Sequence, residues 1–389
     1  MVTSQHHNPR LRFTLEAESP GTRARAGTFQ TLHGAVQTPV FMPVGTQATV
    51  KAQTVESLQA SGAHLLLANT YHLLLRPGID VFKKFAGIHR FMNWPGPVLT
   101  DSGGYQIFSL PHAREMNEAG ARFKSYVDGK SYLLSPESSI AMQQTIGSDV
   151  MMALDQCIQS SAGYIQAQAA MELTHRWAQR SLAARKDSPA ALFGIVQGAG
   201  HPELRKASAT FLRELPFDGL AIGGLAVGET HAERYDLTEL VTEHLPNHLP
   251  RYLMGVGTPA DIARAVSTGI DMFDCILPTR LGRNAWAFTS GGMLKIRNAE
   301  WKEDQRPLDP ACDCPCCRTF SRAYLRHCFN VEEILGLSML SLHNIHYYVG
   351  LMKRLRVAIR DGTLAKVVEE EARRCPPLAG RREGGGEKP

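Results

Sequence analysis

Three aspartates in this 389-residue chain each end an apolar run of strand length. Asp101 ends "GPVLTD", Asp155 ends "DVMMALD" and Asp274 ends "GIDMFD". A carboxylate in such a place loses its water unless a partner compensates, and desolvation or mutual repulsion can separate the pKa values of neighbouring carboxyl groups. One carboxylate could then act as a nucleophile and another as an acid or base. The alternative is that each aspartate caps the helix that follows its strand.

Residues near these aspartates could hold a flat ligand. The pairs Gly103-Gly104 and Gly223-Gly224 would let backbone amides approach such a ligand closely. Gln197, in "GIVQG", adds an amide that can bind a carbonyl edge. Barrel metallohydrolases usually carry His-x-His at the end of the first strand, whereas that end here reads "FMPVGT". A metal at this centre is therefore not expected.

A second group of residues has the spacing of a metal site. Four of the eight cysteines lie in "CDCPCC", where Cys312, Cys314 and Cys317 form C-x-C-x2-C, and His343 follows downstream. Three thiolates and an imidazole make a closed tetrahedral zinc shell of the structural kind, with no open position for chemistry. Such a site would clip a polar insert to the helix after it. Cys316 is spare on this interpretation, and unbound thiols or a C-x-x-C redox pair are the alternatives.

These residues need a scaffold that brings distant strand ends together. Nearly continuous apolar runs are typical of strands buried on both faces of a parallel sheet. Eight such runs cover residues 38–44, 63–69, 96–101, 149–155, 191–197, 219–224, 251–257 and 269–275. Their alternation with helix-like segments predicts an α/β fold of the (β/α)8 TIM-barrel type, with the active site at the C-terminal ends of the strands. A doubly wound open sheet is the alternative, which the missing Gly-rich dinucleotide fingerprint disfavours.

The domain organisation follows from where the helical periodicity stops and returns. It is clear at residues 160–185 and 260–268, and it returns from about Asn344 to Val368. Residues 300–330 are polar, Cys-rich and interrupted by proline. We predict a catalytic barrel over 1–300, a zinc-binding insert over 301–343, closing helices over 344–378 and a disordered tail over 379–389.

Composition restricts the protein class only broadly. Hydrophobic residues are 43% and charged residues 20% of the chain, as in soluble globular proteins. The net charge of +5 permits a polyanionic partner without requiring one. We expect no membrane span, because no apolar run reaches about 18 residues. The N-terminus lacks the apolar region of a secretory signal, so a cytoplasmic location is predicted.

Several motifs together resemble the bacterial tRNA-guanine transglycosylases, also called queuine tRNA-ribosyltransferases. They are "TDSGGYQIFSL", "GIVQG", "FDGLAIGGLAVGE", "YLMGVGTP", "GIDMFDCILPTR" and the cysteine motif with its later histidine. The resemblance runs from about Phe13 to Val368. It implies a (β/α)8 barrel with a zinc-bearing insert. It also implies exchange of guanine at the wobble position of tRNA(Asp, Asn, His, Tyr) for 7-aminomethyl-7-deazaguanine, a step in queuosine biosynthesis.

The resemblance also implies a role for each matching residue. Asp274 would attack the ribose C1′ and hold a covalent intermediate, while Asp101 would be the general acid/base, a pairing that suits glycosidic exchange. In the base pocket, Asp155 would bind the amino and N–H edge, while Gln197 and the amide of Gly224 would bind the carbonyl. Tyr105 and Met254 would cover the two ring faces, and Leu225 and Glu229 would bind the aminomethyl group. Cys157 and Val227 would lie beside that group, and Ser102 would lie next to the acid.

Two further groups match contacts that the family makes with macromolecules. Arg280 and Arg283, in "PTRLGR", match arginines that contact the uridines flanking the target base. Bacterial members are homodimers, and Phe320, Tyr324 and His327 match an aromatic patch at the dimer contact. The alternatives are arginines in surface salt bridges and aromatic side chains that pack only within the insert.

One loop departs from the family pattern, and two other functions compete with this interpretation. Residues 156–161 read "QCIQSS" where the family usually has Glu-Cys-Thr-Pro-Tyr-Pro, so Gln156 replaces a charged residue and both prolines are absent beside the expected site of the 7-substituent. A non-catalytic RNA-binding subunit of the same fold would have an altered nucleophile position, but Asp274 and Asp101 are both present. A barrel hydrolase acting on a small sugar would leave the arginine pair and the base-shaped pocket unexplained.

Overall fold

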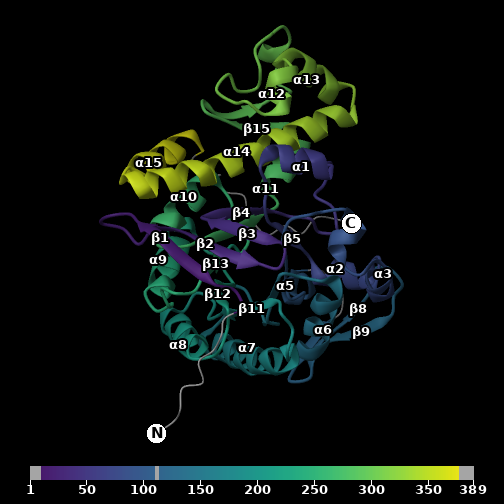
Figure 1. Ribbon diagram of the computed structural model, residues 1–389, viewed down its shortest axis with the longest axis vertical. Coiled ribbons are helices and arrows are strands. Elements are labelled where there is room, and N and C mark those ends of the chain that lie inside the picture. Colours follow the sequence, from purple (N-terminus) through teal and green to yellow (C-terminus); the bar gives the residue numbers. More distant parts are fainter. Residues whose placement is uncertain (1–9, 110–113, 376–389) are drawn as a thin grey trace.

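The centre of the molecule is a closed barrel of parallel strands (Figure 1). The computed structural model describes residues 10–109 and 114–375. In spatial order the strands are β4 (Val40–Pro43), β14 (Met272–Cys275), β13 (Arg251–Leu253), β12 (Gly219–Ile222), β11 (Ala191–Val196), β10 (Val150–Met152), β6 (Val98–Thr100) and β5 (Leu66–Ala68). A parallel bridge between Val44 and Leu67 joins the last strand to the first. The predicted barrel is confirmed, and each predicted apolar run contains one of its strands.

The barrel strands are apolar on both faces because both faces are buried. Val150 and Met152 belong to a cluster inside the barrel that draws on all eight strands, whereas Met151 packs outward with the surrounding helices. Tyr252 and Leu253 alternate in the same way. Successive strand residues point to opposite faces, so a strand between two apolar layers has no polar face. The continuous runs in the sequence follow from this arrangement.

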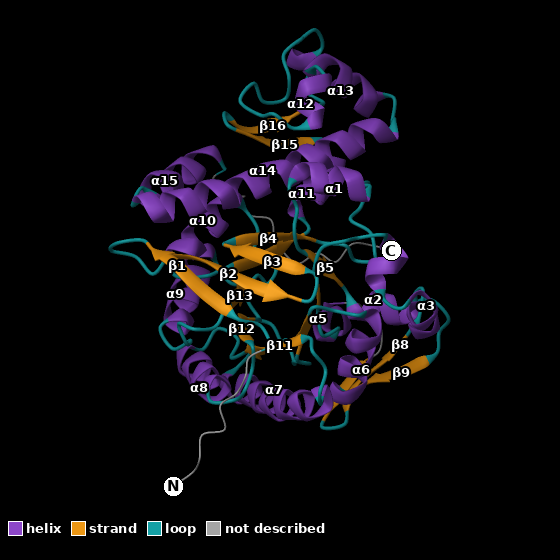
Figure 2. Cartoon of the chain, in the orientation of Figure 1, coloured by secondary structure: helices purple, strands orange, loops and turns teal. Residues whose placement is uncertain are grey.

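Helices surround the barrel, as Figure 2 shows. The predicted helix at 160–185 is α7, and the one at 260–268 is α10, where the hydroxyl of Thr258 accepts from the amide of Asp261 and caps the first turn. These helices are α1 (Val55–Ser61), α2 (Thr70–Leu75), α3 (Ile79–Phe85), α4 (Ile88–Met92), α5 (Gly104–Ser109), α6 (Pro136–Ile146), α7 (Tyr164–Arg185), α8 (Pro202–Arg213), α9 (His231–Thr242), α10 (Pro259–Ser267) and α11 (Leu277–Arg283). None of the helices in the described ranges has the length and apolar character that a membrane crossing requires.

Two three-stranded antiparallel sheets lie outside the predicted pattern. The first contributes Phe29 and Val36 to the cluster inside the barrel, and the second packs Phe123 and Leu134 against Trp177 of α7. Both were missed because their strands are half exposed and lack long apolar runs. They are β1 (Phe13–Glu18), β2 (Arg25–Thr31) and β3 (Gly34–Thr38) in the first sheet, and β7 (Arg114–Asn117), β8 (Gly120–Lys124) and β9 (Ser131–Leu134) in the second.

The Cys-rich region stands on one side of the barrel, joined to it by a long helix (Figure 1). That helix, α14, begins at Ile334 rather than near Asn344, so His343 lies inside it. Its first turns pack against the cysteines through Leu340, whereas Leu355 packs on the barrel, and this change of partner interrupts the periodicity that the sequence showed. The region comprises β15 (Trp286–Thr289), β16 (Gly292–Lys295), η1 (Ala299–Trp301), α12 (Pro315–Thr319), α13 (Arg322–Asn330), α14 (Ile334–Asp361) and α15 (Leu364–Arg374).

The predicted domain boundaries remain a prediction. Ala285, Ala287 and Ile296, which the prediction placed in the barrel, share one apolar cluster with the cysteines. The predicted tail at 379–389, together with residues 376–378, lies outside the described residues.

Candidate active site

The three aspartates singled out in the sequence lie at the C-terminal ends of their strands. Asp101 directly follows β6, Asp155 lies just beyond β10, and Asp274 is within β14. In a parallel barrel these ends meet at one mouth. Asp101 and Asp155 are buried, and Asp274 is partly exposed. No Lys, Arg or His in the described part of the chain forms an ion pair with any of the three.

Asp274 is oriented through one of its two carboxylate oxygens. Its Oδ1 accepts hydrogen bonds from the hydroxyl of Tyr252 at 2.6 Å and from the amide of Gly255 at 2.7 Å. Desolvation by burial raises the pKa of this carboxyl, although both donors act in the opposite direction. The donors leave Oδ2 as the oxygen available to react.

Asp101 is the carboxyl group best placed to exchange a proton near neutral pH. Its Oδ1 accepts from the amide of Thr70 at 2.8 Å, and the side-chain amide of Asn69 donates to Oδ2. Burial, with a smaller contribution from the charge of Asp274, outweighs these donors and raises the pKa of Asp101 to about 6. A general acid/base works best when its pKa lies near the working pH.

Asp155 joins two of the other predicted pocket residues. Its Oδ1 accepts from the hydroxyl of Ser102 at 3.1 Å, and its Oδ2 accepts from Nε2 of Gln197 at 2.7 Å. Burial raises its pKa against these hydrogen bonds. A β-carbon on Gly104 would meet the carbonyl of Asp155 at 2.5 Å, so the small residue is needed for this close approach.

The loop after β12 carries four further predicted residues, Gly224, Leu225, Val227 and Glu229. Gly224 has a φ of +63° and lies against the side chain of Gln197. Glu229 accepts from the amide of Ala226 at 2.5 Å and from that of Val227 at 3.0 Å. Since N–H and C=O point in opposite directions in a trans peptide, the carbonyl of Leu225 points away from Glu229.

Three further predicted residues lie near the aspartates. Tyr105, on α5, is 40% exposed. Partial burial, and then the nearby Cys157 and Asp274, raise the pKa of its hydroxyl, which places Tyr105 close to both. Met254 follows β13 and packs partly on the cluster inside the barrel. Cys157 is buried just beyond Asp155.

The cysteine motif and His343 form one cluster, away from the aspartates. The Sγ atoms of Cys312, Cys314 and Cys317 lie 3.7, 3.5 and 3.3 Å from Nδ1 of His343. A tetrahedral zinc shell, with Zn–S near ~2.3 Å and Zn–N near ~2.1 Å, separates S and N by about 3.6 Å, so these four residues fit a metal ion. Nε2 of His343 lies 2.8 Å from the carbonyl of Phe288, which orients the ring. Cys316 lies outside the cluster, and burial raises the pKa of its thiol.

Comparison with known proteins agrees with this geometry. The family model described as queuine tRNA-ribosyltransferase matches residues 19–377. The chain belongs to the queuine tRNA-ribosyltransferase family. Two curated relatives bear that name. The one from Moorella thermoacetica is 48% identical over 93% of this chain and 97% of its own length, and the one from Acidithiobacillus ferrooxidans is 50% identical over 90% and 94%. This membership makes the chain a tRNA-guanine pentosyltransferase and confirms the predicted family.

Residues that the sequence did not single out position those that it did. Tyr252 holds Asp274, and Asn69 and Thr70 hold Asp101. Arg205 is fully buried and donates to the carbonyls of Gly223, at 3.0 Å, and Gly224, at 2.9 Å, which fixes the start of the loop after β12. Arginine is rarely fully buried in proteins, but the sequence does not show that Arg205 is buried or which groups it contacts.

The residues predicted to contact macromolecules lie on the surface, some of them half-buried. Arg280 and Arg283 are half-buried and one helical turn apart on α11, which directly follows β14 and Asp274. Phe320 and Tyr324 stack with their ring centroids 5.3 Å apart. Tyr324 and His327 are exposed on α13, whereas Phe320 also packs partly on the cysteine cluster.

A second group of potential metal ligands is better explained as a structural clamp. His33 and His89 contact the two oxygens of the buried Asp149 at 2.9 and 3.2 Å, at the opposite end of the barrel from the active site. Their rings stack with centroids 3.6 Å apart and planes 13° from parallel. Lone pairs in two such planes cannot both point at one ion. The pair instead ties the β2–β3 turn and α4 to the start of β10.

Proposed function

We propose that this enzyme exchanges guanine at the anticodon wobble position of tRNA(Asp, Asn, His, Tyr) for 7-aminomethyl-7-deazaguanine. The observation that carries the proposal is the pairing of two carboxyl groups in different environments at one barrel mouth. Asp274 is oriented through Oδ1 alone, and Asp101 has a pKa of about 6. Glycosidic exchange with retention needs one carboxylate to attack and a second to move a proton.

In the first step, Oδ2 of Asp274 attacks the ribose C1′. The bond from C1′ to N9 of guanine breaks, its electron pair remains on N9, and the proton of Asp101 neutralises the departing base. In the second step, the now ionised Asp101 takes the N9 proton of the incoming 7-deazaguanine. That base attacks C1′ and releases Asp274. Protons and charges balance over the cycle, with no redox partner.

The base would be recognised by groups already ordered in the pocket. Asp155 would accept from the amino and ring N–H groups, while the second N–H of Gln197 and the amide of Gly224 would donate to the carbonyl. The carbonyl of Leu225, turned away from Glu229, would accept from the cationic aminomethyl group. Tyr105 and Met254 would cover the two faces of the flat ring, and Cys157 and Val227 would lie beside the substituent.

The remaining surface groups would bind the RNA and a second subunit. Arg280 and Arg283 would contact the nucleotides that flank the target base. The Cys312, Cys314, Cys317 and His343 cluster would hold one structural zinc ion, which stabilises the region carrying Phe320, Tyr324 and His327. Because these aromatic side chains are clustered and two are exposed, we propose that they form the contact of a homodimer. Its tRNA substrate places the enzyme in the cytoplasm.

The decisive test is exchange of labelled guanine into tRNA by the wild type and by Asp274→Asn. We expect the variant to lose exchange and the covalent RNA adduct on denaturing gels, while tRNA binding persists. Asp236→Asn, at an exposed position on α9, is the matched control and should behave as the wild type. Exchange by Asp274→Asn at the wild-type rate would exclude this residue as the nucleophile. Base release without tRNA would point to a hydrolase acting on small sugars.

A further inference from the structure

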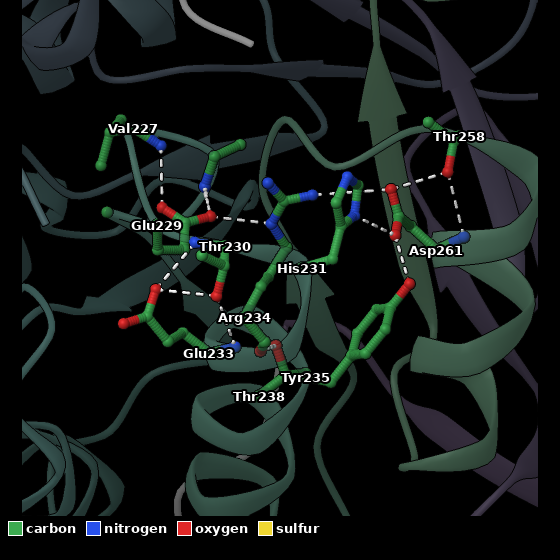
Figure 3. A network of polar contacts seen from close by, with 12 residues as sticks. Val227, Glu229, Thr230, His231, Glu233, Arg234, Tyr235, Thr238, Thr258 and Asp261 are labelled. Carbon is green, nitrogen blue, oxygen red and sulfur yellow. Dashed lines mark hydrogen bonds and ion pairs between the residues drawn. The ribbon is translucent and has the colours of Figure 1, made fainter. Parts of the chain in front are cut away.

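Three buried charged side chains in contact with one another join the loop after β12 to the start of helix α10 (Figure 3). Nε of Arg234, on α9, donates to Oε1 of Glu229 at 2.7 Å, and its Nη1 lies 3.5 Å from Oδ2 of Asp261. The side chains of Arg234, Glu229 and Asp261 are 4%, 2% and 0% exposed. One guanidinium thus lies between two carboxylates that water barely reaches, where electrostatic interactions are strong.

Each of the two carboxylates, Glu229 and Asp261, organises one loop of the active site. Glu229 holds the amides of Ala226 and Val227 and so sets the direction of the Leu225 carbonyl. Asp261 accepts from the hydroxyl of Thr258 at 2.6 Å at the start of α10. The segment just before it includes Gly255, whose amide donates to Asp274. Arg234 therefore lies between the loop that would read the base and the loop that supports the nucleophile.

We propose that Arg234 is a specificity-determining positioning residue that holds the Glu229 carboxylate against the amides of Ala226 and Val227. The Leu225 carbonyl then stays turned toward a base whose 7-substituent carries hydrogen-bond donors. This inference rests on the proposed function of the same pocket. The effect of Arg234 on the base is expected to pass through Glu229.

The electrostatics of Glu229 support this role. Burial by itself raises the pKa of its carboxyl, but the hydrogen bond and charge of Arg234, with help from the Ala226 amide, lower it below its ordinary value. If the guanidinium were removed, burial would dominate and Glu229 would take up a proton at higher pH. A neutral carboxyl is a poorer acceptor for two amides, so the Leu225 peptide would lose its fixed direction.

The other charged and titratable groups near Glu229, Arg234 and Asp261 include Arg205, His231, Tyr235 and Arg264, with the Arg264 guanidinium 6.0 Å from the centroid of the Tyr235 ring. Arg205, on α8, is a second buried cation; burial lowers its pKa to about 10, against the opposing effect of the Glu229 charge. Arg205 itself donates to backbone carbonyls rather than to Glu229. Asp261 also contacts His231, at 3.0 Å, and the hydroxyl of Tyr235, at 2.6 Å. Arg234 is thus the direct cationic partner of Glu229 in the described part of the chain.

The test compares two bases in the same enzyme, since guanine lacks the 7-substituent. KM and kcat of Arg234→Gln would be measured for 7-aminomethyl-7-deazaguanine and for guanine exchange between about pH 5.5 and 8.5. We expect KM for the aminomethyl base to rise roughly tenfold, and further as the pH falls, with KM for guanine changed less than about twofold. Arg213→Gln, at an exposed arginine at the end of α8, should leave both values unchanged.

Two more variants make the result decisive. Glu229→Gln should raise KM for the aminomethyl base without the added dependence on pH. Arg234→Lys, which keeps the charge, should restore most of the selectivity, and Glu229→Gln carries the test if Arg234→Gln does not fold. An equal rise in KM for both bases, or no rise in either, would overturn the inference about Arg234. Guanine exchange by the wild type would in that case still support the proposed function. Loss of guanine exchange by the wild type would instead overturn the proposed function.

Discussion

The hydroxyl of Tyr252 donates a 2.6 Å hydrogen bond to Oδ1 of Asp274, and so connects the packed interior of the barrel to this carboxylate at its mouth. Tyr252 is 1% exposed and belongs to the cluster inside the barrel, so its ring cannot move without disturbing that packing. The amide of Gly255 reaches the same oxygen. The carboxylate that we propose as the nucleophile is therefore held by the buried core rather than by a mobile surface group.

Replacing Tyr252 with phenylalanine should slow formation of the covalent adduct roughly tenfold, because one hydrogen bond that orients the carboxylate is lost. The same loss removes a donor that favours the charged form, so the pKa of Asp274 should rise and the acid limb of the rate should move to higher pH. Single-turnover adduct formation against pH measures both effects. Tyr164→Phe, at an exposed tyrosine on α7, is the control. An unchanged rate and profile in Tyr252→Phe would contradict this role.

The two half-reactions should respond to pH in opposite directions. Adduct formation needs a proton on Asp101, whose pKa is about 6, so its rate should fall as the pH rises above that value. Attack of the incoming base on the trapped adduct needs Asp101 ionised, so its rate should increase over the same range. Asp101→Asn should slow both steps by about 10²–10⁴-fold and abolish both dependences. Parallel pH profiles for the two steps would argue against a single shared acid/base.

Removal of one ligand from the Cys3His cluster should release the metal. Cys312→Ala is expected to lose one equivalent of zinc per chain, to lower the thermal stability of residues 285–343 and to weaken dimerisation. Cys316→Ala is a close control, because that thiol is buried two residues from Cys314 but lies outside the ligand set. Elemental analysis and sedimentation distinguish the variants. Equal zinc content in both would refute the assigned ligands.

The clamp at the other end of the barrel should contribute to stability and not to chemistry. Burial raises the pKa of Asp149, but hydrogen bonds from His89, Val98 and His33 outweigh it and leave the pKa lowered. A depressed carboxyl pKa stabilises the fold above the unfolded value of ~3.9, and the contribution is lost as the pH falls through the folded value.

Asp149→Asn should therefore lower the free energy of unfolding by about 2–3 kcal/mol near neutral pH, with a smaller loss below about pH 4. Denaturant titration at several pH values measures this difference, with Asp236→Asn as an exposed control. Guanine exchange by the folded variant should be unchanged. A loss that did not depend on pH would show that the ionised carboxylate is not the source of the stability.

Local pattern was enough to predict the eight barrel strands, because burial on both faces leaves apolar runs that need no knowledge of neighbours. It was also enough for the ligand set around His343, because metal ligands follow a recognisable spacing. It was not enough for Tyr252, Asn69 or Arg205. Their residue types are ordinary in sequence, and their roles arise from contacts with residues far along the chain. The first turns of α14 were missed for a related reason, since they pack on the Cys-rich region and not on the barrel.

Aspartates occur at both ends of the barrel, and the apolar runs place Asp149 and Asp155 on the same strand segment. The sequence by itself determined that such residues border buried strands and, through its motifs, to which family the chain belongs. Only the tertiary structure decided how each one is compensated. Asp149, Asp218 and Asp271, at the N-terminal ends, meet His33, Arg185 and Arg25 from distant segments. Among the described residues, Asp101, Asp155 and Asp274 accept hydrogen bonds from neutral donors and pair with no cation, so burial raises their pKa values.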